Sequence, residues 1–126
     1  MRLFKYASAL ALLASLTLIN SVRADDQAQS KEIKGVLIDT HCGEKMMKES
    51  DPQAAAEKHP KDCCVKCGND SGTFAIISDG KMTPLDDKSN TMAKDYINKD
   101  DSKTDVVVQG SVVDGKLSIT SIKAAE

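Results

Sequence analysis

The sequence predicts an α+β domain, mainly β, in which five short strands form a small OB-like barrel with a helical, cysteine-bearing insertion after strand 1. Two Asp-Gly pairs, each between apolar segments, indicate two β-hairpins and therefore four strands. A β-branched apolar run before the first cysteine supplies the fifth strand. Five strands with a helix before the final hairpin match a small OB-like barrel. An open five-stranded sheet with helices on one face is the alternative.

The first strand is predicted over 32–39, where Gly35 suggests a bend or a bulge. Residues 40–50 are expected to form a loop with a weak helical turn. Asp51 and Pro52 then fit the N-cap and first residue of a helix that continues to residue 58. Pro60 interrupts this helix, and a second short helix is predicted from Pro60 to Cys67. Gly68 is expected to end it in the left-handed conformation.

The remaining elements are two hairpins and one helix. The first hairpin turns at Asp79-Gly80, and Pro84 in its returning strand favours an edge position. The second turns at Asp114-Gly115, and its last strand loses the apolar–polar alternation at Ile122, which suggests a bulge. The acidic pairs at 86–87 and 100–101 are expected in solvated loops. The predicted ranges are strands 73–78 and 81–85, a helix over 89–98 with Met92, Ala93, Tyr96 and Ile97 on one face, and strands 105–113 and 116–122.

The N-terminal residues 1–24 have the pattern of a secretory signal peptide. A basic front is followed by an apolar run over 7–19, and Val22-Arg23-Ala24 provides a cleavage site. The run is shorter than the roughly 20 residues that a spanning helix needs. We therefore expect a periplasmic or secreted protein with no membrane attachment after cleavage. Residues 25–31 are a flexible lead-in, and 32–126 form a single domain.

Charge and composition narrow the classes of partner. The signal segment carries three of the 17 basic residues and none of the 19 acidic ones, so cleavage changes the formal charge from −2 to −5. An acidic domain does not suit nucleic acid or an anionic membrane surface. Only Phe74 and Tyr96 remain as aromatic residues. Small exported domains with so thin a core usually need a covalent or metal staple.

The cysteines are the residues most suited to that role. Three of the four lie between His59 and Gly68, and Cys42 follows His41 directly. An exported domain with an even cysteine count suggests disulfides. The pairing least in conflict with helix geometry is Cys42–Cys63 together with Cys64–Cys67. Closing the first of these loops would stabilise the fold by about 3 kcal/mol.

A metal site competes for the same side chains. His59, Cys63 and Cys67 have the spacing i, i+4, i+8, which places them on successive helical turns. Cys42 would complete a tetrahedral Cys3His site for zinc or Cu(I). His41 is a competing ligand, which Asp39 could orient.

Thiol–disulfide redox chemistry through Cys64 and Cys67 is the alternative from another class of function. A reactive thiolate is stabilised at a helix N-terminus, whereas this Cys-x-x-Cys is predicted at a C-terminus. The chain also lacks a phosphate loop, a nucleophile elbow and a metalloprotease helix. We therefore expect a non-enzymatic domain, whose Cys/His cluster is a disulfide staple or a metal site. A barrel module that binds a protein partner is a further possibility.

The segment from Gly35 to Lys45 contains Asp-x-x-Cys-Gly-x-Lys, and a Cys-x3-Cys follows at Cys63 and Cys67. With Phe74, Asp79-Gly80-Lys81 and the Val-rich final hairpin, the chain resembles an uncharacterised family of small secreted bacterial proteins. The resemblance implies an exported OB-like domain without an assigned activity. It also implies that Cys64 is the additional thiol, because that position is usually not cysteine. Cys42, Cys63 and Cys67 are then the working trio, which suits a metal site slightly better than disulfides.

Overall fold

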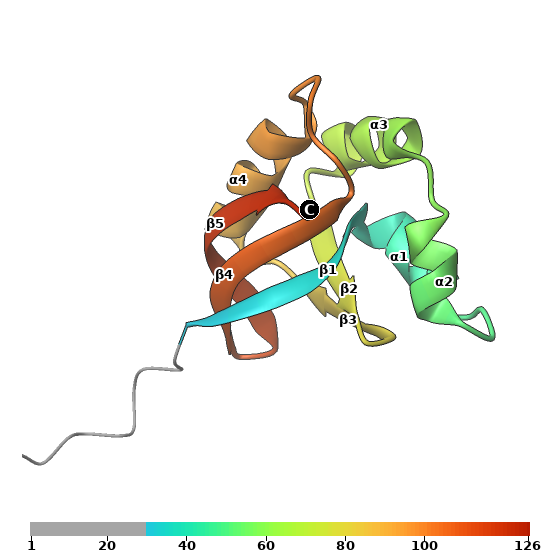
Figure 1. The fold of residues 1–126 in the computed structure, drawn as a ribbon, viewed down its shortest axis with the longest axis horizontal. Coiled ribbons are helices and arrows are strands. Elements are labelled where there is room, and N and C mark those ends of the chain that lie inside the picture. The colour runs from blue at the N-terminus through green and yellow to red at the C-terminus, as the bar shows by residue number, and fades with distance from the viewer. Residues whose placement is uncertain (1–29) are drawn as a thin grey trace, which may run out of the picture.

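The computed structural model describes residues 30–126. Within them the chain forms five strands and four helices (Figure 1). The predicted signal peptide, residues 1–24, and residues 25–29 of the predicted lead-in lie outside the described residues. Lys31, which the lead-in was predicted to include, is instead the first residue of β1. The elements in chain order are β1 Lys31–Asp39, α1 Thr40–Met46, α2 Pro52–Glu57, α3 Lys61–Ser71, β2 Phe74–Ser78, β3 Lys81–Pro84, α4 Asp87–Ile97, β4 Asp105–Val113 and β5 Lys116–Ala124.

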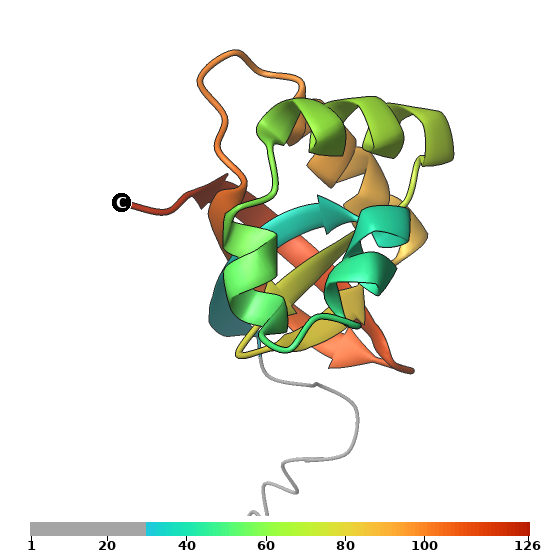
Figure 2. The same ribbon diagram turned by 90° about the vertical axis from the view of Figure 1, so that its right-hand side faces the viewer.

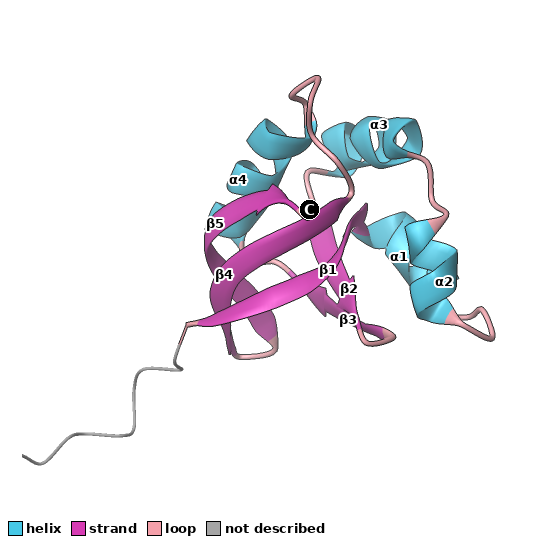
Figure 3. Ribbon diagram, in the orientation of Figure 1, coloured by secondary structure: helices cyan, strands magenta, loops and turns pink. Residues whose placement is uncertain are grey.

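The five strands form one antiparallel sheet in the order β3-β2-β1-β4-β5, which confirms the α+β prediction (Figure 3). Strand pairing does not close the sheet into the barrel that the sequence predicted. β3 is the edge strand and ends at Pro84, as expected, because proline has no N–H to continue the ladder. The two outer strands meet at a single parallel bridge between Leu85 and Leu117.

Helices cover both faces of the sheet, not one face as in the open-sheet alternative (Figures 1 and 2). α3 and α4 bury a cluster that includes Leu37 of β1 and Phe74 of β2. α1 and α2 lie over the other face, where Val36 and Ile38 of β1 are buried. Successive strand residues point to opposite faces, so β1 supplies both clusters. It is also the central strand, and its C-terminal end lies where helices from both layers approach.

α1 and α3 both extend beyond their predicted limits. α1 is a helix from Thr40, directly after β1, where a loop was expected. α3 continues through Gly68 to Ser71, and Gly72 adopts the left-handed conformation instead, with φ 69°. Gly68 has a packing role, because a Cβ atom at this position would lie 2.3 Å from Cε1 of Phe74. The prediction that Gly68 ends α3 was therefore wrong, and Gly72, four residues later, ends it.

The strands agree closely with the sequence pattern. Both Asp-Gly turns form, and Asp79 and Asp114 have positive φ, as two-residue hairpin turns require. Gly35 pairs regularly with Val106, so β1 has no bulge at this position. The bulge in the last hairpin lies at Thr120 of β5, two residues before the predicted position, since Gln109 pairs with Ser121 and Gly110 pairs with Ile119.

α4 is anchored at its start by side chains that reach β5 and β2. Asp86, predicted in a solvated loop, is instead the N-cap, and its carboxylate accepts a 2.9 Å hydrogen bond from the Ser89 N–H. The Ser89 hydroxyl oxygen accepts the N–H of Ile119. The side-chain oxygen of Asn90 accepts the N–H of Phe74. These bonds connect the helix with β5 and β2, which are not paired with each other.

Replacing Asp86 by alanine is expected to lower the free energy of unfolding by about 1 kcal/mol at pH 7, because the N-cap is lost. Hydrogen bonds from the Ser89 hydroxyl and N–H lower the pKa of this carboxyl in the folded protein. Its contribution is therefore complete above the unfolded pKa near 3.9 and declines as the pH falls through the lower folded value. Urea unfolding at pH 7 and at pH 3 measures this dependence. Exposed Asp95 of the same helix, changed to alanine, is the control, and a loss of equal size at both pH values would contradict the assignment.

Candidate functional site

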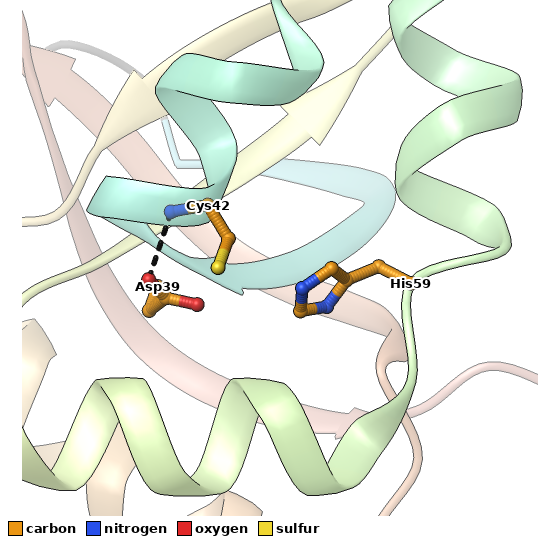
Figure 4. Close-up of side chains that lie close together, drawn as sticks. All are labelled: Asp39, Cys42 and His59. Carbon is orange, nitrogen blue, oxygen red and sulfur yellow. Dashed lines mark hydrogen bonds between the residues drawn. The ribbon is translucent and has the colours of Figure 1, made fainter.

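The candidate site lies at the C-terminal end of β1. Asp39, Cys42 and His59 each place one donor atom there, and the three atoms lie within 4.8 Å of one another. Asp39 ends β1, Cys42 is in the first turn of α1, and His59 is in the connection between α2 and α3. Figure 4 shows the carboxylate, the thiol and the imidazole pointing toward a common space. Three short segments thus bring oxygen, sulfur and nitrogen donors together.

Asp39 has a local role that explains its orientation. It is the N-cap of α1, and its Oδ2 accepts a 2.9 Å hydrogen bond from the Cys42 N–H. An Asp three positions before a residue with a free N–H is a standard N-cap arrangement. The carboxylate is completely buried, and Oδ1 has no hydrogen-bond partner in the described part of the chain. Unsatisfied buried oxygens are rare in folded proteins, so this oxygen marks the site.

The Cys42 thiol is half-buried beside this carboxylate. Burial raises the pKa of Cys42 to about 12, and the hydrogen bond and negative charge of Asp39 contribute further, followed by Cys67. Cys67 of α3 adds a smaller contribution to this rise in the pKa of Cys42. The Cys67 thiol therefore lies near Cys42, outside the group of three donor atoms.

His59 reaches the site from a connection and not from a helical face. α2 ends at Glu57, Pro60 is the N-cap of α3, and α3 begins at Lys61. Proline disfavours the helical conformation in the residue that precedes it, so His59 cannot belong to α3. The predicted i, i+4 relation with Cys63 assumed one helix through both residues, and that assumption is wrong.

The cysteines of α3 point in different directions. Cys64 and Gly68, four residues apart, form the buried side of the helix. Cys67 is half-buried next to that side, whereas Cys63 is exposed. Of the four ligands predicted from sequence, the structure therefore brings Cys42 and His59 together, places Cys67 near Cys42 and leaves Cys63 exposed. Asp39 lies at the site instead, where the sequence pattern indicated only a partner for His41.

His41 lies outside the group as well. It is exposed, and the Asp39 carboxylate caps the Cys42 N–H. The signal that could have identified Asp39 is its spacing of three residues before Cys42, which places an N-cap carboxylate beside that side chain. That signal requires a helix beginning at Thr40, where the sequence pattern predicted a loop.

The described residues contain four free thiols. Cys64 is completely buried in the cluster beneath α3, and its thiol donates to the Leu37 carbonyl oxygen at 3.5 Å. Burial raises the pKa of Cys64 to about 12, with the negative charge of Asp39 as a further cause. A nucleophilic cysteine requires a lowered pKa and access to solvent. Cys64 has neither property, which disfavours redox chemistry through Cys64 and Cys67.

Comparisons with protein-family models, with curated proteins and with solved structures found no match to this chain. The resemblance to small secreted bacterial proteins therefore stays a prediction. In residues 30–126 no helix combines the length and the apolar character needed to cross a membrane.

Alkylation of the folded, reduced protein at pH 8 is expected to modify Cys63 first and Cys64 last. Cys63 is exposed, whereas a pKa of about 12 leaves on the order of one Cys64 thiolate in ten thousand. Peptide mass spectrometry after timed iodoacetamide treatment measures the order, and the urea-unfolded chain is the control in which the four rates converge. Rapid labelling of Cys64 in the folded protein would restore the redox alternative.

Proposed function

We propose that this chain is an exported, non-enzymatic domain that binds one metal ion, zinc or copper, through Asp39, Cys42 and His59, with Cys67 as the fourth ligand. The observation that carries the proposal is the buried Oδ1 of Asp39, which lacks a hydrogen-bond partner within residues 30–126 and faces a thiol and an imidazole. Burying an uncompensated carboxylate costs several kcal/mol. A bound cation would supply both the missing contact and the opposite charge.

The donor set suits these metals. Zinc takes carboxylate, thiolate and imidazole ligands at about 2.0–2.3 Å in a tetrahedral arrangement, in which neighbouring donor atoms are roughly 3.6 Å apart. The three donors lie within 4.8 Å of one another, so shifts of about 1 Å would close them around an ion. The ligand set predicted from sequence was Cys3His. The set proposed here contains Asp39 in place of Cys63, so its donors are oxygen, nitrogen and sulfur.

The bound ion would hold the helical insertion together. Its ligands come from the end of β1, from α1, from the connection before α3 and from α3 itself. These segments otherwise contact one another through short helices with few buried residues. Metal binding to a folded site adds directly to folding stability. The ion thus takes the role of the staple that a small exported domain with a thin core requires.

Two further features belong to the proposal. The strand order, the bridge between Leu85 and Leu117, and the position of α4 between β3 and β4 support an OB-like fold, which is a partly open five-stranded barrel. Export is supported by the basic front, apolar run and cleavage pattern of residues 1–24. The acidic charge that remains after cleavage disfavours nucleic acid as a partner.

The reduced protein is expected to bind one equivalent of zinc, measured by elemental analysis and by competition with a chromophoric chelator. Cys42→Ser and His59→Ala each remove a ligand, and the affinity should fall by about tenfold or more. Cys63→Ser and His41→Ala are the matched controls, because they change the same residue types at exposed positions. Unchanged binding in both ligand variants would contradict the proposed site, and a loss in Cys63→Ser would favour the ligand set predicted from sequence.

Expression of the full chain in a secreting bacterium is expected to release a protein that begins at Asp25. The reason is the apolar run followed by Val22-Arg23-Ala24, which a signal peptidase recognises. Intact-mass measurement of the periplasmic and cytoplasmic fractions identifies the first residue and the compartment. An Arg2→Glu, Lys5→Glu variant, which removes the basic front, is expected to stay uncleaved. A cytoplasmic wild-type chain that retains residues 1–24 would contradict export.

A further inference from the structure

We infer that the free carboxylate oxygen of Asp39 makes this site selective for zinc over Cu(I). The inference rests on the proposed function, since it names which of the two metals the same site takes. Asp39 is the N-cap of α1 through Oδ2 and, in this proposal, a metal ligand through Oδ1.

The hydrogen bond of the N-cap fixes the orientation of the Asp39 carboxylate. Oδ2 is held by the Cys42 N–H at 2.9 Å, so the group cannot turn away without releasing the start of α1. Oδ1 is buried and carries no other bond within the described residues. Figure 4 shows this oxygen, the one without a dashed line, pointing toward the space that the Cys42 thiol and the His59 imidazole share. Asp39 therefore offers one fixed oxygen, as a monodentate ligand does.

Ligand type favours zinc at such a site. Cu(I) is selected by soft thiolate and thioether sulfur, whereas a carboxylate suits harder cations. Zinc accepts oxygen, nitrogen and sulfur ligands together. The sulfur donor within the group is that of Cys42. Half-buried Cys67 of α3 is taken as the second, because the Cys64 thiol is bound to the Leu37 carbonyl oxygen in the core and Cys63 is exposed.

Charge favours the same ion. One carboxylate and two thiolates carry three negative charges around a buried oxygen, and the neutral imidazole of His59 adds none. A divalent ion leaves a net charge of −1, whereas Cu(I) leaves −2. Residual charge is costly where the surroundings exclude water. Burial of Asp39 therefore makes the doubly charged ion the better match.

Asp39→Asn tests the inference, with Asp51→Asn as the matched control. Asparagine keeps an oxygen that accepts the Cys42 N–H and preserves the cap, but it removes the charge and weakens the oxygen as a ligand. Asp51 is also an N-cap carboxylate, which accepts the Ala54 N–H at 3.1 Å, and it is exposed outside the site. The probes are zinc and Cu(I) alone, each competed against a chromophoric chelator under reducing conditions.

Zinc affinity should fall by about tenfold or more in Asp39→Asn while Cu(I) affinity stays unchanged or rises, and Asp51→Asn should leave both unchanged. Equal losses for the two ions, or no loss for zinc, would overturn the inference and leave the proposed metal site intact. Failure of the wild-type protein to bind either ion would instead overturn the proposed function.

Zinc-edge X-ray absorption of the loaded wild-type protein provides a readout that does not depend on the variant folding. The expected shell contains two sulfur and two oxygen or nitrogen ligands. A shell with three or four sulfurs would overturn the role assigned to Asp39, because Oδ1 would then have no place among the ligands.

Discussion

The hydrogen bond from the Cys42 N–H to Asp39 Oδ2 is the interaction on which the site depends. It converts the end of the central strand into the start of α1 within one residue. The same bond fixes one carboxylate oxygen and leaves the other buried without a partner within residues 30–126. A capping interaction that stabilises a helix therefore also orients a charged group toward Cys42 and His59. In our proposal, a bound metal ion offsets the free-energy cost of burying the Asp39 carboxylate.

Packing of α3 on the sheet supplies the rest of the site. Cys64 and Gly68 form the side of the helix that touches β1 and Phe74, and the absence of a side chain at Gly68 permits this close contact. Once that side is buried, helical geometry directs Cys67 toward Cys42 and leaves Cys63 in solvent. The apolar core thus selects which cysteines become available as ligands.

Features whose causes are local in sequence were predicted well. The two Asp-Gly turns form hairpins because their positive φ values match the twist of the flanking strands. The Asp51-Pro52 start of α2 is also local and was predicted correctly. The errors arose where two nearby residues could serve one role. Gly72 ends α3 in place of Gly68, because the core requires Gly68 inside the helix, and Asp86 is a cap because α4 begins beside both outer strands.

The sequence by itself determined the strands, the hairpin turns and the segment that carries the helical insertion with its cysteines and histidines. It also identified Cys42, His59 and Cys67 as candidates. Only the tertiary structure decided that Asp39 belongs to the site and that Cys63 does not. The physical reason is that side-chain direction depends on helix phase, and the phase of α1 and α3 is set by long-range packing against β1 and β2. Spacing along the chain cannot supply that information.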